Sequence, residues 1–185
     1  RPHVAAFCSW LAEQFQQVPQ LADWRHGMEP NGRPSGWSWT TGGNTPAWYG
    51  QGAVMSDGVD AARSGAITNG RTTWIEAVVS GPGTLSFWWK VSSETNYDYL
   101  RFYVGGVQQA RISGEVGWVQ ASVAIAAGPQ ALRWAYSKDG AVIAGQDAGW
   151  VDQVVWTPCP APAVTSFAIN NGADATTSQM VALTP

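Results

Sequence analysis

Charged residues are scarce in this chain of 185 residues: Asp, Glu, Lys and Arg make up 12% of it, about half of the ~25% found in typical soluble domains. The formal net charge is −3, which argues against a nucleic-acid partner, because such proteins need a basic surface. Long hydrophobic runs are missing too. No run approaches the ~18 residues of a membrane-spanning helix, so we expect no membrane span, and no signal peptide is recognised.

Histidine and cysteine are also rare, with two of each. His3 and His26 both precede the region rich in strand-forming residues, which argues against a zinc site and against Ser-His-Asp chemistry. Cys8 and Cys159 leave two alternatives open. They form one disulfide that joins the two ends of the β region in an extracellular protein, or they are two unpaired thiols.

Aromatic residues, glycine and proline are abundant by contrast, with 12 Trp, 21 Gly and 11 Pro. Between Trp37 and Trp156, short runs of Val, Ile, Thr and aromatic residues alternate with Gly-rich turns, which predicts strands rather than helices. We expect an all-β, antiparallel jelly-roll β-sandwich. Its strands are predicted at 37–40, 53–56, 61–66, 72–79, 84–92, 98–104, 107–113, 117–126, 130–137 and 149–156.

The segments on either side of the β region differ from it in composition. Apolar residues at three- and four-residue steps predict an amphipathic helix over residues 2–18. The expected organisation therefore has four parts. They are an N-terminal helix with an irregular lead-in (1–36), the sandwich (37–157), a Pro-rich linker (158–163) and a final segment (164–185).

The central sequence GTLSFWWKV predicts one strand with two different faces. Leu85, Phe87 and Trp89 alternate with Trp88 and Lys90, which is typical of a half-buried strand. A turn at residues 81–83 would join this strand to the preceding one as a hairpin. The hairpin predicts an outer patch in which Trp74 lies opposite Lys90 as a cation–π pair. The patch comprises Trp74, Glu76, Trp88 and Lys90.

Further aromatic residues are expected on the surface. In the strand over 98–104, Tyr99, Arg101 and Tyr103 point outward, and the loop at 42–52 carries Trp48 and Tyr49 among glycines. Flat aromatic rings beside charged groups suit a carbohydrate ligand, because a sugar ring has apolar C–H faces and polar hydroxyls. Three alternatives stay open: the 2–18 helix covers the outer face, the loop aromatics fold back to seal the sandwich, or the surface contacts another protein.

Carboxylates suggest two kinds of chemistry. Asp139, Asp147 and Asp152 surround a Gly-rich loop near the last strand, and such oxygen ligands suit Ca²⁺. The alternative is that Asp139 and Asp147 stabilise turns and caps while Asp152 pairs with an Arg. A glycosidase would need two carboxylates facing a groove, and its candidates are Glu76, Glu94, Asp98 and Glu115.

Three sequence runs carry a family resemblance: GPGTLSFWWKVSSETNYDYLRFYVGG, ISGEVGWVQ, and LRWAYSKDG with DAGWVDQVVW. They resemble a jelly-roll module of large secreted and surface proteins of bacteria, similar to MAM-like and concanavalin-like β-sandwiches. This resemblance implies a structural Ca²⁺ held with the help of Asp152. The final segment, VTSFAINNGADATTSQMVALTP, resembles the first strands of a bacterial immunoglobulin-like repeat, and we expect the natural protein to continue beyond it.

The sequence thus favours a non-catalytic module of a secreted or cell-surface bacterial protein that binds a polysaccharide or glycan through surface aromatics. One alternative is a structural spacer or a protein-interaction and adhesion module, which would self-associate through the N-terminal helix or a sheet edge. The second alternative is a jelly-roll glycoside hydrolase.

Overall fold

The computed structural model describes residues 37–159. The helix predicted over 2–18, both histidines, most of the linker and the segment 164–185 lie outside this range. The described residues form eight strands and no helix. The strands are β1 (Trp39–Gly43), β2 (Tyr49–Gln51), β3 (Ala61–Arg63), β4 (Thr72–Ser92), β5 (Tyr99–Val104), β6 (Val107–Ile112), β7 (Glu115–Ser137) and β8 (Ala148–Pro158).

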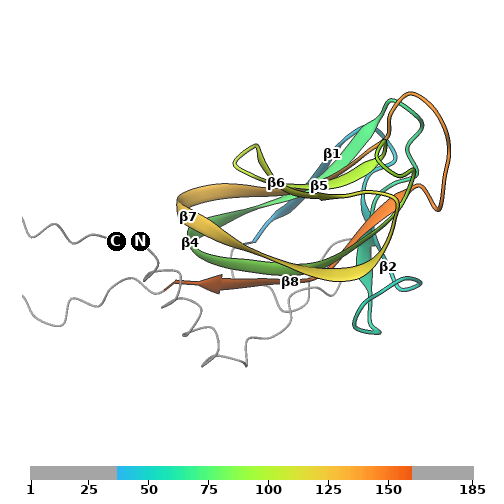
Figure 1. Ribbon diagram of the computed structural model, residues 1–185. Helices are drawn as coiled ribbons and strands as arrows, with labels where there is room; N and C mark the ends of the chain where they lie inside the picture. The colour runs from blue at the N-terminus through green and yellow to red at the C-terminus, as the bar shows by residue number, and fades with distance from the viewer. Residues whose placement is uncertain (1–36, 160–185) are drawn as a thin grey trace, which may run out of the picture.

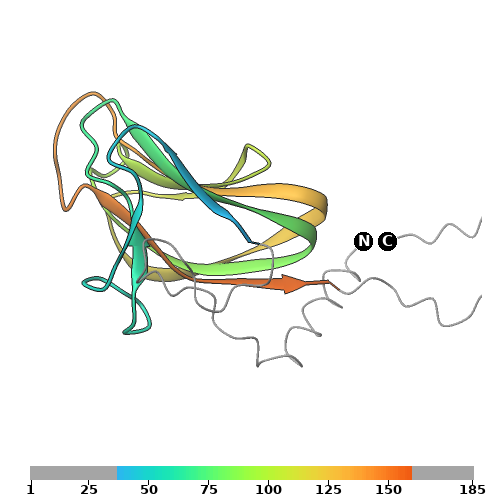
Figure 2. The ribbon, with the colours of Figure 1, turned by 180° about the vertical axis from the view of Figure 1, so that it is seen from behind.

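All strand pairs are antiparallel, and together they make one sheet that folds over on itself. β4 and β7, with 21 and 23 residues, are long enough to pass through both layers. The first layer contains β1, the first half of β4, the second half of β7, β5 and β6. The second layer contains β2, β3, β8, the second half of β4 and the first half of β7. Figures 1 and 2 show β4 and β7 curving together from one layer into the other.

The predicted hairpin at residues 81–83 is wrong. The two strands predicted at 72–79 and 84–92 are one strand, β4, and those at 117–126 and 130–137 are also one strand, β7. Gly81 lies where the pairing of β4 with β7 shifts register. A Cβ atom at Gly81 would collide with the backbone carbonyl of Ala126. The glycine therefore permits a bend at which two strands come very close together, rather than a reversal of the chain.

Two smaller expectations also need correction. The strand predicted at 53–56 is absent from the described residues, and the strand in this region is β2, inside the predicted loop 42–52. Cys159 is disulfide-bonded, so the unpaired alternative does not hold for this thiol. Cys8, the other cysteine of the chain, lies outside the described range.

The core lies between the two layers and is rich in aromatic rings. Leu85, Phe87 and Trp89 are buried, as the alternation predicts. The Trp134 ring centroid lies 5.1 Å from that of Phe87 and 4.9 Å from that of Phe102. Inward and outward positions keep the same alternation through the bend of β4, so both halves of this strand contribute to one core.

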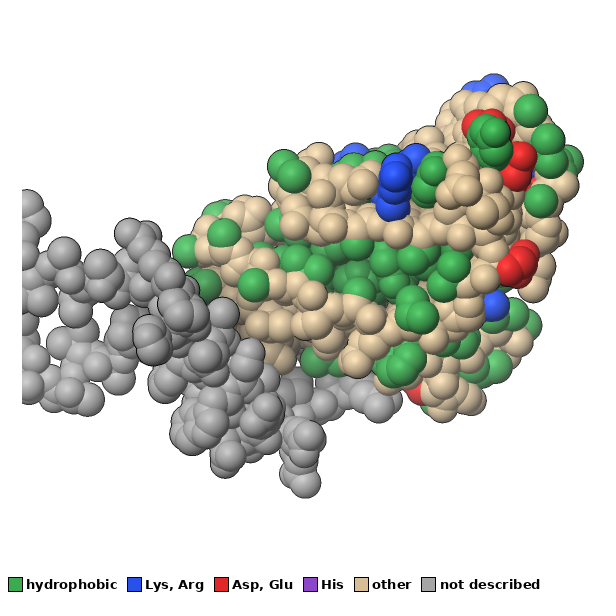
Figure 3. Space-filling model, viewed as in Figure 1, with side chains coloured by type: hydrophobic (Ala, Val, Ile, Leu, Met, Phe, Trp, Pro, Cys, Tyr) green, Lys and Arg blue, Asp and Glu red, His purple; other side chains and the backbone are tan. Residues whose placement is uncertain are grey.

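The described part of the chain is thus an all-β, antiparallel β-sandwich. On the side shown in Figure 3, hydrophobic side chains remain visible between the two layers. Partly buried apolar residues of β6 and of the first half of β7 pack against the core, among them Ile112, Val116 and Val123. The described residues contain no helix that is long and apolar enough to cross a bilayer.

Candidate functional site

The outer face of the first layer brings together residues from five strands. Residues directly opposite each other in neighbouring strands point to the same face. One row across this face is formed by Gly42, Trp74, Ala135, Arg101 and Arg111. The next row contains Thr40, Glu76, Arg133 and Tyr103. The pairing order β1-β4-β7-β5-β6 therefore decides which side chains meet.

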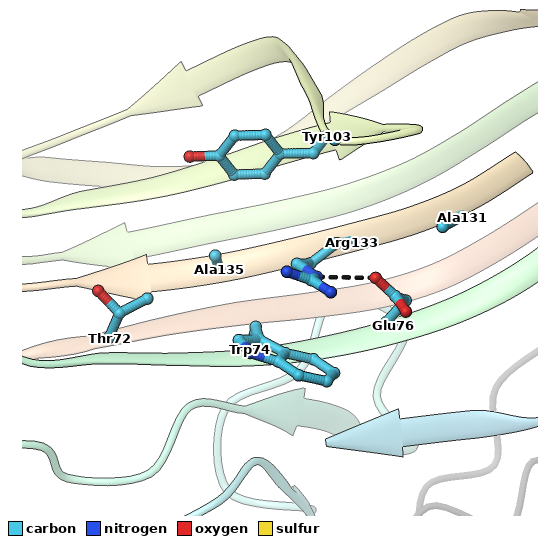
Figure 4. A pocket seen from close by; sticks show the side chains of 8 residues that line it. Thr72, Trp74, Glu76, Tyr103, Ala131, Arg133 and Ala135 are labelled. Atoms are coloured by element: carbon cyan, nitrogen blue, oxygen red, sulfur yellow. Dashed lines mark hydrogen bonds and ion pairs between the residues drawn. The ribbon is translucent and has the colours of Figure 1, made fainter. Parts of the chain in front are cut away.

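A cavity of about 480 Å³ lies on this face, and we call it the first-layer cavity. Figure 4 shows Trp74 on one side and Tyr103 on the other, with the small residues Ala131 and Ala135 between them. The alanines leave room on β7 because their side chains are short, whereas the flanking strands carry large rings. The lining residues are Thr72, Trp74, Glu76, Tyr103, Gly106, Ala131, Arg133 and Ala135.

The Trp74 indole is held in place from two sides. It extends over Gly42 of β1, where a Cβ atom would collide with its six-membered ring. The Arg133 guanidinium carbon lies 4.2 Å from the centroid of the Trp74 ring. Arg133 Nε also donates a hydrogen bond of 2.7 Å to Glu76 Oε2 (Figure 4). The indole, the guanidinium and the carboxylate are thereby fixed relative to one another before any ligand binds.

The structure divides the predicted patch of Trp74, Glu76, Trp88 and Lys90 between two surfaces. Trp74 and Glu76 line the first-layer cavity, whereas Trp88 and Lys90 lie in the half of β4 that belongs to the second layer. The predicted Trp74–Lys90 pair is therefore wrong, because β4 bends into the other layer instead of turning back. Trp74 pairs with Arg133, and Lys90 Nζ lies 5.7 Å from the centroid of the Trp150 ring.

The two loop aromatics have different environments. Trp48 is 3% exposed and belongs to the core. This agrees with the alternative in which the loop aromatics fold back and seal the sandwich. Tyr49 is exposed, and its hydroxyl accepts a hydrogen bond of 2.6 Å from Arg63. Neither residue lines the first-layer cavity.

The outward residues of β5 lie in or beside the cavity. Tyr103 lines the cavity, and Arg101 lies opposite the lining residue Ala135. Tyr99 lies opposite Ser137, two residues further along β7. Arg133 was not a predicted site residue, although its alternation with Leu132 and Trp134 places it on the outer face. Its role depends on β7 lying between β4 and β5, which local sequence patterns do not specify.

Carboxylates gather at the loops that follow β4 and β7. Glu94, Asp98 and Asp139 each place an oxygen within 4.8 Å of the others, and we call them the acidic cluster. Asp98 Oδ1 accepts a hydrogen bond of 2.8 Å from the Asp139 backbone N–H. The buried Lys138 ammonium contacts Asp147 and lies 3.9 Å from Asp98 Oδ2.

Electrostatics in this cluster disfavour further negative charge. Burial raises the pKa of Asp98, while the Asp139 backbone N–H and the Lys138 ammonium act in the opposite direction. Burial also raises the pKa of Glu94, and the neighbouring Asp139 and Asp98 carboxylates raise it further.

Asp152 lies apart from the acidic cluster, so the three predicted metal ligands do not meet. Asp147 precedes β8, whereas Asp152 is inside it and faces the loop after β2. The Asp152 carboxylate accepts hydrogen bonds of 2.7 Å from the backbone N–H groups of Ser56 and Gln153. Burial raises the pKa of Asp152 to about 6 despite these hydrogen bonds, with a further contribution from Asp57.

The four glycosidase candidates do not form a pair across the cavity. Glu76 is the single carboxylate among its lining residues, and Glu94 and Asp98 belong to the acidic cluster. Glu115 accepts a hydrogen bond of 2.7 Å from the Ser92 hydroxyl. Glycoside hydrolysis usually requires two carboxylates on either side of the scissile bond, and the lining of this cavity provides one.

No protein-family model and no curated protein matches the sequence, but solved structures resemble the fold. The secreted serine protease VesC from Vibrio cholerae aligns with a TM-score of 0.53 and 18% identity over 64% of this chain, which spans 24% of VesC. A carbohydrate-binding module, TmCBM61 in complex with β-1,4-galactotriose, aligns with a TM-score of 0.44 and 13% identity over 65% of this chain and 88% of that one. The module CBM36, in complex with calcium and xylotriose, aligns with a TM-score of 0.38 and 15% identity over 65% of this chain and 94% of that one. At these identities, the likeness to VesC shows a shared fold.

Proposed function

We propose that this chain is a non-catalytic carbohydrate-binding module and that the first-layer cavity is its glycan site. The observation that carries the proposal is the arrangement of Trp74 and Tyr103 on either side of a floor of alanines, with the Glu76–Arg133 ion pair beside them. The volume of about 480 Å³ lies within the range of small-molecule sites.

Each part of the cavity has a role toward a sugar ring. The part of the Trp74 indole that borders the cavity, beside the Arg133 guanidinium, offers an apolar surface to the C–H groups of a pyranose. Glu76 accepts hydrogen bonds, Arg133 donates them, and the hydroxyls of Tyr103 and Thr72 do both. Because Trp74 and Arg133 already hold each other in place, binding needs little further loss of side-chain entropy.

Replacing Trp74 by alanine should weaken glycan binding by at least about tenfold, the loss expected when an aromatic platform worth roughly 1–2 kcal/mol is removed. Affinity gel electrophoresis against a panel of plant, algal and bacterial polysaccharides identifies the ligand, and calorimetry on that ligand measures the affinity. Trp88→Ala is the matched control, because it removes the same side chain from the same strand in the other layer. Absence of retardation on every polysaccharide, or equal losses in both variants, would contradict the proposal.

We propose that the module acts outside the cell, in a secreted or cell-surface protein of a bacterium. Disulfides persist in oxidising compartments and are rare in the cytosol, and Cys159 is disulfide-bonded. In this proposal residues 37–157 are the binding unit, the segment 1–36 precedes it, and a Pro-rich linker and the start of an immunoglobulin-like repeat follow it. The resemblance to modules of bacterial surface proteins supports this placement.

We also propose that the acidic cluster binds Ca²⁺. Asp98 is fully buried, yet its Oδ2 atom has no hydrogen-bond partner, and Glu94 Oε2 is also buried without one. Three clustered carboxylates together with Asp147 outnumber the Lys138 ammonium. A hard divalent cation with oxygen ligands would satisfy both the oxygens that lack a hydrogen bond and the excess negative charge.

Removal of the ion should then lower the melting temperature, because a ligand that binds the folded state stabilises it. We expect a decrease on adding EDTA and full recovery with Ca²⁺, measured by differential scanning fluorimetry. Asp139→Asn should abolish the response to Ca²⁺, whereas Asp57→Asn, which changes a carboxylate outside the cluster, should retain it. An identical melting curve with EDTA and with Ca²⁺ would mean that Lys138 alone balances the cluster.

A further inference from the structure

Positive charge is concentrated on the face that carries the first-layer cavity. Three arginines point outward there, from β5, β6 and β7, and Glu76 is the one carboxylate in the same two rows. The chain as a whole has a net charge of −3, so this face differs in sign from the molecule. In Figure 3, Lys and Arg side chains lie along the upper edge, on the side of β5 and β6. The arginines are Arg101, Arg111 and Arg133.

Two of these arginines repel each other because they face each other across neighbouring strands. Arg101 and Arg111 are directly opposite each other in β5 and β6, and like charges at such positions repel. Neither forms an ion pair with a carboxylate in the described part of the chain. Arg133, by contrast, is neutralised by Glu76. No carboxylate of the described residues offsets this repulsion, so an anionic group of a ligand could be accommodated between the two guanidinium groups.

The two guanidinium groups are positioned by their neighbours. Their carbons lie 4.3 Å and 4.9 Å from the centroid of the same Tyr99 ring. The Tyr99 hydroxyl donates a hydrogen bond of 2.8 Å to the Asn96 carbonyl, which fixes that ring. Arg101 also donates a hydrogen bond to the Ser137 hydroxyl. Stacked and partly hydrogen-bonded arginines keep free N–H groups that can bind a carboxylate or a sulfate in a bidentate way.

The arginine pair continues the surface of the cavity. Arg101 is opposite Ala135, and Ala135 is opposite Trp74, so the three residues form one row from the pair to the aromatic wall. A single extended ligand can therefore contact both regions. The cavity itself is balanced in charge, whereas the neighbouring surface is positive.

We propose that the ligand is an anionic polysaccharide, with a sugar ring in the first-layer cavity and a carboxylate or sulfate group on Arg101 and Arg111. This inference rests on the proposed function, because it needs a glycan in the cavity. It adds the chemical class of the ligand and assigns Arg101 and Arg111 as specificity-determining residues.

The test compares polymers that differ only in charge. Polygalacturonate is compared with the same polymer after its carboxylates are reduced to alcohols, and dextran sulfate is compared with dextran. Calorimetry at low salt should show at least about tenfold tighter binding of one charged polymer than of its neutral partner. The pair that shows the preference identifies the anion as carboxylate or sulfate.

The Arg101→Gln/Arg111→Gln double variant should remove this preference and flatten the salt dependence with which the charged polymer binds, because both positive charges are lost. Lys90→Gln is the matched control, since it removes a positive charge from the second layer. Equal binding of charged and neutral polymers, or a preference that survives in the double variant, would overturn the inference.

Three further outcomes separate this inference from the proposed function. If Trp74→Ala abolishes binding of a neutral polymer and the arginine variant changes nothing, the cavity binds glycans and the anionic class is wrong. If the arginine pair binds charged polymers and Trp74→Ala has no effect, the cavity is not the glycan site, and both proposals fail. Equally tight binding of double-stranded DNA would indicate a general polyanion surface and would also overturn the inference.

Discussion

Replacing Lys138 by methionine should lower the free energy of unfolding by about 3–5 kcal/mol, the usual cost of breaking a buried ion pair from one side. The Lys138 side chain is 1% exposed, so its charge is stabilised by protein groups rather than by water. It contacts the Asp147 carboxylate and lies 3.9 Å from that of the fully buried Asp98. Methionine keeps most of the volume but leaves Asp98 without a cation.

Urea denaturation at pH 7 in the presence of EDTA measures this effect without a contribution from Ca²⁺. Lys90→Met is the control, because Lys90 is partly exposed and forms no ion pair with a described carboxylate. The Lys138→Met/Asp147→Asn double variant should lose less than the sum of the two single variants, because the residues interact directly. A loss below about 1 kcal/mol for Lys138→Met would show that water reaches the acidic cluster.

Local alternation in the sequence was sufficient to predict which side chains point inward. Leu85, Phe87 and Trp89 are buried because the side-chain period of a strand is two, whatever the strand pairs with. The chain reversal predicted at residues 81–83 is wrong because local patterns do not specify the partner strand. Glycine and proline are typical of turns, but the same residues allow a sharp bend within a strand, and the distant partner β7 decides between them.

The same distinction explains how much of the candidate site could be predicted. Trp74, Glu76 and Tyr103 were expected on an outer face, and each lines the cavity. That Trp88 belongs to another surface and that Arg133 joins the site depend on the strand order β4-β7-β5. Composition and periodicity carry no information on this order.

The acidic residues show the same limit. The sequence groups Asp139 with Asp147 and Asp152, because all three lie around one Gly-rich loop near the last strand. Its partners in the acidic cluster, Glu94 and Asp98, come from the loop before β5. They meet Asp139 because β5 pairs with the end of β7, at Tyr99 opposite Ser137.

The bend of β4 provides the second large effect. Replacing Gly81 by alanine should lower the free energy of unfolding by about 3 kcal/mol, at the upper end of the cost of overpacking. The new Cβ atom would collide with the backbone carbonyl oxygen of Ala126 in β7, and a backbone group cannot rotate away as a side chain can. Relief would require the two strands to separate where they pass from the first layer to the second.

Gly117→Ala provides the matched control for this prediction. Gly117 also lies in a long strand, β7, but no atom lies within 4 Å of a Cβ atom built there. Alanine at that position should leave stability unchanged or raise it by about 0.5–1 kcal/mol, because glycine loses more backbone entropy on folding. Urea denaturation of the two variants at the same pH compares them directly. Equal stability of Gly81→Ala and Gly117→Ala would mean that the strands do not approach closely at the bend. Trp74 and Trp88 lie on two surfaces because β4 crosses between the layers at this bend. Equal stability would therefore also count against this explanation of their separation.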